Sequence, residues 1–333
     1  MPFIHLRTHT EFSVVDGTLR IDAAAAAARD DGQGAMAITD FNNLFGAVKF
    51  YKACRGAGVK PLIGADLLME PLAEGGDKAP SRLLVLVQNS QGFLNLCELL
   101  SRGWTRNTQR AQAWMKWEWL TELSGGLIAL SGADLGALGV ALLAGDDAKA
   151  RTVAGRLSDV FPGRFYIELQ RAGLPTNEPH VRAAVALAAA LQLPVVATHP
   201  VQFLEADDFE SHEARVCVAE GELLANPKRV KRFSAEQYMK SQAQMEALFA
   251  DVPTSLAHSL QIAQCCNLSL VLGRPQLPDF PTPLIDGVHQ PIEAYFREQS
   301  TSGLERRLLT LFPDPTVRQQ RRAEYEADRK SVV

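Results

Sequence analysis

The sequence predicts an α/β fold built on a parallel sheet, either open or closed into a barrel. Short apolar runs recur along the first two thirds of the chain, and most are near-continuous, as strands covered on both faces should be. Helical patterns lie between them, and this alternation implies right-handed βαβ units and therefore a parallel sheet. The expected strands are FIHL (3–6), AMAIT (35–39), PLIGADLLM (61–69), LLVLV (83–87), LIAL (127–130), FYIEL (165–169) and PVVAT (194–198).

The helical segments between these runs carry their own signals. In IDAAAAAARDD (21–31), the alanines allow close packing on a sheet, and Gly32 follows as a stop. The segment NNLFGAVKFYKACRGAG (42–58) repeats this plan. Further helices are expected at 91–102, 136–157 and 177–192.

Polar residues follow most of the expected strands. Ligands bind at the carboxyl ends of parallel strands, so these positions are the first candidates for a site. They predict a polar pocket at one mouth of the sheet, although they do not define its chemistry. The positions are Thr8-His9, Thr39-Asp40, Asp66, Gln88-Asn89, Ser131, Gln170-Arg171 and Thr198-His199.

The composition is that of a globular protein, with 47% hydrophobic and 22% charged residues. No basic region followed by an apolar run opens the chain, and no stretch is apolar enough to span a membrane. The five cysteines form no CxxC pair, which favours reduced thiols. We therefore expect a soluble cytoplasmic protein. Because the net charge is −4, any nucleic-acid contact must use a local patch.

The pattern changes after about residue 205, where only helices are expected, at 206–222, 234–250 and 253–267. We expect a first domain over 1–271, with the barrel at about 1–205 and a helical extension at about 206–271. Four prolines between residues 272 and 283 break regular structure, so 272–288 is expected to be a linker.

Two charged amphipathic helices are expected beyond the linker, at 289–311 and 315–328. They have too few apolar residues to form a core alone, so we expect 289–327 to begin a domain whose remainder is missing. The ending DRKSVV (328–333) matches the translation of a common sequencing-adapter oligonucleotide. We therefore expect a truncated reading frame with a non-native tail.

Several motifs occur together in one known family, in the same order and at the same spacings. Over residues 2 to about 327, the chain resembles the N-terminal part of the bacterial replicative DNA polymerase III alpha subunits. That part is a polymerase-and-histidinol-phosphatase (PHP) domain followed by the first helices of the palm. The resemblance implies a distorted (βα)7 barrel, in agreement with the alternation of strands and helices. The motifs are HLRTHTEFSVVDG (5–17), AMAITDFNNLFGAVKFYKACRGAGVKPLIGAD (35–66), LVQNSQGFLNLCELLSRG (86–103), LPVVATHPVQF (193–203) and LPDFPTP (277–283).

The resemblance also implies a metal centre, which this sequence has eroded. In metal-binding members, histidines, carboxylates and one cysteine at the strand ends hold metal ions that activate water against a phosphoester. Here four residues at ligand positions remain suitable, namely His9, Asp16, Asp40 and the shorter Asp66. The other ligand positions hold Arg7, Phe41, Arg82, Ala133, Pro200 and Gln202.

A cation at a ligand position repels a metal, so we interpret this centre as lost. Arg7 and Arg82 are expected to neutralise Asp40 and Asp66 and to form an ion-pair network in the same pocket. The alternative is a residual metal site, to which His199 could add a substitute ligand. We favour an ordinary hydrogen-bonded role for His199 and expect neither a metal nor a catalytic residue in this chain.

The resemblance implies a DNA-directed DNA polymerase as the full-length protein, with magnesium held in a palm segment beyond residue 333. This fragment alone is expected to be inactive and to support the palm. Its implied partners are other holoenzyme subunits, notably the proofreading exonuclease, and primer-template DNA through the full-length protein. The competing hypotheses are a free-standing PHP phosphoesterase and a pure interaction module.

Three other features allow a nucleic-acid interpretation. The run NPKRVKRF (226–233) could contact a DNA backbone, although a solvated charge run is favoured because no aromatic residue is interleaved. Core packing is favoured over base stacking for Trp114, Trp117 and Trp119. Exposure on a helix surface is the default for Arg306, Arg307, Arg318, Arg321 and Arg322.

Overall fold

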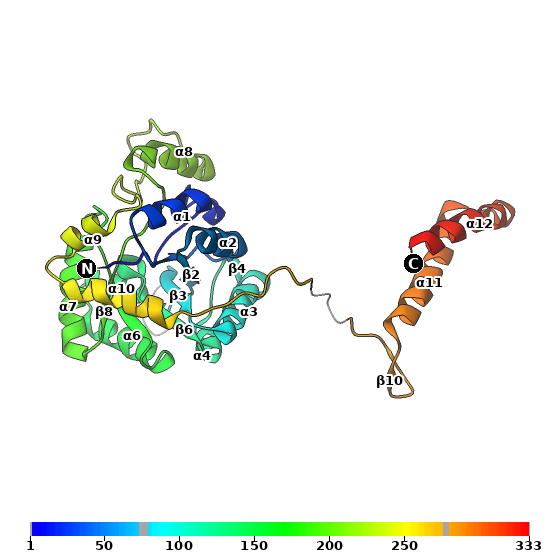
Figure 1. The fold of residues 1–333 in the computed structure, drawn as a ribbon, viewed down its shortest axis with the longest axis horizontal. Helices are drawn as coiled ribbons and strands as arrows, with labels where there is room; N and C mark the ends of the chain where they lie inside the picture. Colours follow the sequence, from blue (N-terminus) through cyan, green and yellow to red (C-terminus); the bar gives the residue numbers. More distant parts are fainter. Residues whose placement is uncertain (1, 73–78, 276–279, 333) are drawn as a thin grey trace. The chain divides into compact units, whose positions relative to one another are not determined.

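The computed structural model describes residues 2–72, 79–275 and 280–332, with residues 328–332 described by their backbone alone. The chain divides into two compact units, Met1–Leu270 and Val271–Val333. Figure 1 shows helices packed around a curled sheet in the first unit and a pair of helices in the second. No helix among the described residues is long and apolar enough to cross a membrane.

The first unit contains a six-stranded mixed sheet in the order β1-β2-β3-β6-β7-β8. Every strand expected from residue 35 onward is present, but the expectation of an all-parallel sheet is wrong at β3, which is antiparallel to both of its neighbours. Residues 70–80, between β2 and β3, are too few for the crossover that a parallel pair needs. The strands are β1 (Ala35–Ile38), β2 (Lys60–Met69), β3 (Ser81–Val87), β6 (Leu127–Leu130), β7 (Phe165–Gln170) and β8 (Val195–Thr198).

The first residues of the chain link the two edges of this sheet. Residues 3–6 are not a regular strand, contrary to expectation. Instead, the His5 carbonyl accepts a hydrogen bond from Ala37 N at 2.8 Å, on the β1 edge. His9 N donates to the carbonyl of Val201 at 2.9 Å, just after β8. The N-terminal segment therefore completes a barrel wall, and the α/β barrel class is confirmed.

Helices cover the outside of the sheet in positions close to those expected. Two expectations need correction: segment 136–157 is split into α5 and α6 by Gly145, which has a φ of +73°, and segment 234–250 is helical only in α9. The helices are α1 (Ile21–Asp30), α2 (Ala47–Ala57), α3 (Ser90–Arg106), α4 (Trp117–Leu123), α5 (Ala137–Leu143), α6 (Asp147–Val160), α7 (Asn177–Leu191), α8 (Phe209–Glu220), α9 (Gln242–Leu248) and α10 (Pro253–Cys265). Shorter elements are the 3-10 helices η1 (Glu11–Ser13), η3 (Ala133–Leu135) and η4 (Ala206–Asp208), and the hairpin of β4 (Thr108–Gln109) and β5 (Gln112–Ala113).

Both faces of the sheet are buried, which explains the near-continuous apolar runs. On β3, Leu83 and Val85 belong to the core cluster that contains residues of α3 to α7. Leu84 and Leu86 belong to a second cluster, which also contains Ile262 of α10. Successive side chains on a strand point to opposite faces, so every strand of this sheet except β1 contributes to both clusters. On β1, Ala37 belongs to the second cluster and Ile38 to a third.

The second unit contains a hairpin of β9 (Leu284–Ile285) and β10 (Val288–His289), followed by α11 (Ile292–Leu311) and α12 (Pro315–Val332). The hairpin lies in the segment expected to be an irregular linker, of which residues 276–279 lie outside the described part. Leu308 is buried here, and Phe312 meets Tyr325 edge to face. The side chains of the expected tail, 328–333, also lie outside the described part.

Candidate functional site

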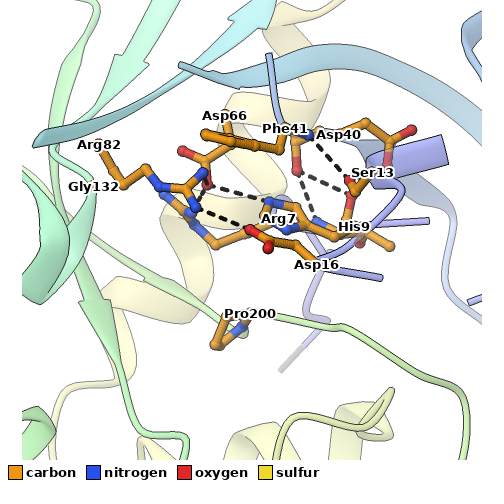
Figure 2. Close-up of polar contacts among 12 residues, drawn as sticks. Arg7, His9, Ser13, Asp16, Asp40, Phe41, Asp66, Arg82, Gly132 and Pro200 are labelled. Carbon is orange, nitrogen blue, oxygen red and sulfur yellow. Dashed lines mark hydrogen bonds and ion pairs between the residues drawn. The ribbon is translucent and has the colours of Figure 1, made fainter. Parts of the chain in front are cut away.

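A pocket of about 650 Å³ opens at one mouth of the barrel. Its walls come from the N-terminal segment, the ends of several strands and the loop around residue 232. Five of the seven predicted site residues line it, namely Arg7, His9, Asp16, Asp66 and Arg82. Figure 2 shows their side chains converging.

The period-2 alternation of strands explains this convergence. On β2, Leu62 packs in the second core cluster, and Asp66 lies on the same face, nearer the mouth. Leu84 and Arg82 are related in the same way on β3. Because β3 is antiparallel, the start of this strand reaches the mouth. Its other end does not, so the expected contribution of Gln88-Asn89 is wrong, and Asn89 instead caps α3 by accepting from Gly92 N at 3.0 Å.

Arg7 lies at the centre of a buried ion-pair network. Its Nη1 is 2.5 Å from Asp66 Oδ2, and its Nε is 2.8 Å from Glu168 Oε1. A second bond joins Nη2 to Glu168 Oε2 at 3.2 Å, which makes the Arg7–Glu168 contact bidentate. The side chains of Asp66 and Glu168 are at most 1% exposed, so both carboxylates need a compensating charge, and for Glu168 the Arg7 guanidinium supplies it.

Arg82 extends the network towards solvent. It donates to Asp66 Oδ2 at 3.2 Å and to Asp16 Oδ2 at 3.0 Å, and thereby ties the loop after η1 to β3. Its guanidinium also lies over the ring of Phe41, 3.7 Å from the ring centroid. Figure 2 shows Asp66 between the two arginines. The expected pairing of Asp66 with both cations is therefore present.

The arginines of the pocket shift the pKa of Asp66. Burial by itself would raise the pKa of Asp66, but the charges of Arg7 and Arg82 outweigh burial and hold this pKa well below its usual range. Asp66 is therefore ionised throughout the physiological range.

The expected ion pair between Asp40 and an arginine is wrong. Asp40 Oδ1 instead accepts hydrogen bonds from Thr10 N at 2.6 Å and from Ser13 Oγ at 2.7 Å. The Thr10 hydroxyl donates to the same carboxylate, at 2.9 Å from Oδ2. Burial raises the pKa of Asp40, and these donors only partly offset that effect. Asp40 therefore holds η1 in place from beneath the pocket.

The two predicted histidines occupy different environments. His9 faces the pocket, with Nε2 3.2 Å from Asp66 Oδ2 and Nδ1 3.3 Å from Gln202 Nε2. His199 does not line the pocket. Its neighbour Thr198 points inward to Glu168, so strand alternation turns His199 outward, where Nε2 lies 2.8 Å from the Glu236 carbonyl.

Glu168 was missed in the sequence analysis, although it anchors the network. Besides Arg7, it accepts from Thr198 Oγ1 at 2.5 Å, Gln170 Nε2 at 2.9 Å and Gly132 N at 3.1 Å. A signal was present: a charged residue inside the apolar run FYIEL needs a buried partner. Its face was also predictable, because Tyr166 of the second core cluster lies two residues earlier.

The residues present do not fit a metal ion. Two guanidiniums lie within 3.2 Å of the Asp66 carboxylate, where a cation would be repelled. Asp40 is saturated by Thr10 and Ser13. Across the part of the chain that the structure describes, no three His, Cys, Asp or Glu side chains are grouped so that they could hold a metal.

Comparison with solved structures finds proteins with little sequence similarity to this chain. An amidohydrolase from Chromobacterium violaceum aligns with a TM-score of 0.41 at 14% identity, covering 64% of this chain and 96% of that one. A two-domain protein of Bacteroides vulgatus, described as containing a predicted PHP-like metal-dependent phosphoesterase, aligns with a TM-score of 0.37 at 11% identity, covering 73% and 62%.

Curated sequences give a closer relation. The chain is 44% identical over 331 residues to the DNA polymerase III subunit alpha of Pseudomonas aeruginosa, covering 99% of this chain and 27% of that protein. It is 41% identical over 324 residues to the same subunit of Escherichia coli K12, covering 97% and 27%. The chain thus spans about a quarter of the length of these relatives, and its resemblance to the alpha subunits is confirmed. The PHP domain family model matches residues 5–172, about half of the chain. This chain belongs to the PHP domain family.

Proposed function

We propose that this chain is the N-terminal region of a replicative DNA polymerase III alpha subunit. The observation that carries the proposal is its identity of 41–44% to such subunits over 97–99% of its own length. A free-standing enzyme of the same fold has no reason to keep that similarity through α11 and α12, outside the first unit.

In this proposal the PHP domain has a structural role. Arg7 and Arg82 stand at ligand positions of the metal-binding relatives and compensate Asp66, Glu168 and Asp16. Such a network stabilises one arrangement of the strand ends without any catalysis. A rigid PHP domain would then brace the palm that follows it and provide a docking site for the proofreading exonuclease.

Polymerisation itself is proposed for the full-length protein, in the cytoplasm, with other holoenzyme subunits and primer-template DNA as partners. Its magnesium ions would be held by a palm segment that this chain does not contain. The 333 residues alone are therefore expected to extend no primer.

A chimera tests the polymerase assignment. Residues 2–327 of this chain replace the corresponding region of the Pseudomonas aeruginosa alpha subunit, and primer extension is measured for the chimera and for this chain alone. The proposal expects extension by the chimera only. A folded but inactive chimera, or template-dependent incorporation by this chain alone, contradicts it.

Docking of the exonuclease needs its own measurement. The chain and the proofreading exonuclease of the same genome are mixed at micromolar concentration and analysed by gel filtration and calorimetry. We expect a 1:1 complex that forms with the first unit, Met1–Leu270. If calorimetry detects no heat of binding and the two proteins do not co-elute, the docking role is refuted, and only the bracing of the palm remains proposed.

A further inference from the structure

Two segments of the first unit are basic and free of carboxylates, although the whole chain has a net charge of −4. They are residues 42–58 and 101–116, and neither contains an aspartate or a glutamate. Even spacing of the 38 acids over the 333 residues would place about two in each segment. Their cations are Lys49, Lys52, Arg55, Arg102, Arg106, Arg110 and Lys116.

The fold brings these two segments together through Asn42. Trp104 Nε1, near the end of α3, donates to the Asn42 carbonyl at 2.9 Å. Asn42 Nδ2 donates to the Ala113 carbonyl at 2.8 Å, on strand β5 of the hairpin. Figure 1 shows α2, the hairpin and α3 along one side of the first unit. The start of the first basic segment therefore adjoins the second, and α2 carries the first segment's cations away from that contact.

Four of the seven cations are available in these two segments. Lys49 pairs with Glu11, Arg102 pairs with Glu98 and Glu122, and Lys116 lies over the Trp119 ring. The remaining four are exposed, and no carboxylate of the described residues lies within ion-pair distance of them. They are Lys52, Arg55, Arg106 and Arg110.

Two large aromatic side chains are exposed among these cations. Phe45 is 70% exposed, just before α2, and Trp104 is 44% exposed. The hydrogen bond to Asn42 fixes the indole, so a base stacking on it would not have to order it first. Basic surfaces with exposed aromatic rings are the way in which proteins hold single-stranded nucleic acid.

We propose that this basic aromatic face, made of Phe45, Trp104, Lys52, Arg55, Arg106 and Arg110, binds single-stranded DNA. The four cations contact phosphates, and the two rings stack on bases. A duplex can contact the four cations through its phosphates, but it cannot stack bases on the two rings, because its bases are already stacked on one another. This inference does not depend on the proposed polymerase role, since the chain itself presents every residue that it needs.

The test is fluorescence anisotropy of a labelled 20-nucleotide oligothymidylate titrated with the full chain. Four phosphate contacts predict a slope of about −3 for log K against log salt, and therefore about a 50-fold loss of affinity between 50 and 200 mM salt. Replacing all four cations by alanine should bring this slope close to zero. Phe45→Ala should weaken binding by about 5- to 150-fold, as expected for one stacked base.

Matched controls make each outcome informative. A second quadruple alanine variant removes four other exposed cations, Arg151, Arg182, Arg274 and Arg297, and should bind within twofold of the wild-type chain. Trp104→Phe keeps a ring but loses the bond to Asn42, and it should retain more affinity than Trp104→Ala. An equal loss in the control quadruple variant, equally tight binding of a 20-base-pair duplex, or unchanged affinity in Phe45→Ala would each overturn the proposal.

Discussion

Removing the Arg7 guanidinium tests whether the ion-pair network stabilises the fold. In Arg7→Met, Asp66 keeps Arg82, but Glu168 keeps only neutral donors, from Thr198, Gln170 and Gly132. Glu168 is 0% exposed, so its charge would be buried without compensation. The expected loss in free energy of unfolding is about 3–5 kcal/mol at neutral pH.

Double-mutant cycles identify which carboxylate is coupled to Arg7. Glu168→Gln removes the charge that Arg7 compensates, so the double variant Arg7→Met with Glu168→Gln should lose at least 1 kcal/mol less than the sum of the single losses. Asp40 has no arginine partner, and Asp40→Asn should cost about 1–3 kcal/mol through its Thr10 and Ser13 hydrogen bonds alone. Its effect should add to that of Arg7→Met within about 0.5 kcal/mol.

Equilibrium urea denaturation followed by tryptophan fluorescence measures these energies. The four tryptophans all lie between residues 104 and 119, so the signal reports the first unit only. An Arg7→Met variant with the urea midpoint of the wild-type chain would show that Arg7 does not stabilise the fold. Coupling of Arg7 with Asp40 and not with Glu168 would show that Glu168 is not its partner.

Three further predictions concern pH, the η1 loop and metals. Burial lowers the pKa of His199 to about 3 and that of His5 to about 4, so both are neutral in the fold and protonate once unfolded. Because both folded pKa values lie below the unfolded value of about 6.5, stability should fall as the pH drops below that value, by about 2 kcal/mol per histidine at pH 5. His199→Asn should remove about 2 kcal/mol of this loss in urea titrations at pH 7.5 and 5, and an unchanged pH dependence would contradict the assignment. Arg82→Ala frees Asp16, so limited proteolysis should cut residues 13–17 at least tenfold faster than in Arg151→Ala. Elemental analysis after gel filtration should find less than about 0.1 equivalents of zinc, manganese or iron, and one tightly bound ion that is lost in His9→Ala would restore the phosphoesterase hypothesis.

Local sequence patterns predicted much of the architecture. Apolar runs and helical periodicity located all six strands of the sheet and most helices, because burial on both faces leaves a mark on every residue of a strand. The direction of the strands was not predicted as well. The alternation of strands and helices predicted parallel pairing throughout, yet the short β2–β3 connection makes β3 antiparallel.

The candidate site shows the same division. The family pattern and the residue types predicted that Arg7 and Arg82 meet Asp66, and opposite charges at one mouth of the barrel do pair. Which carboxylate each arginine reaches was not encoded in any short stretch of sequence. Asp40 follows β1 and Asp66 lies within β2, but Asp40 is saturated by Thr10 and Ser13.

The sequence by itself determined the fold class, the strand positions and the cations that occupy ligand positions, because these depend on residue type and local periodicity. Only the tertiary structure decided that Glu168 is the second partner of Arg7, that His199 points away from the pocket, and that Asn42 adjoins Trp104. Those relations join residues that are distant along the chain. Their geometry depends on sheet register and on the face that each strand presents, and both emerge only when the barrel closes.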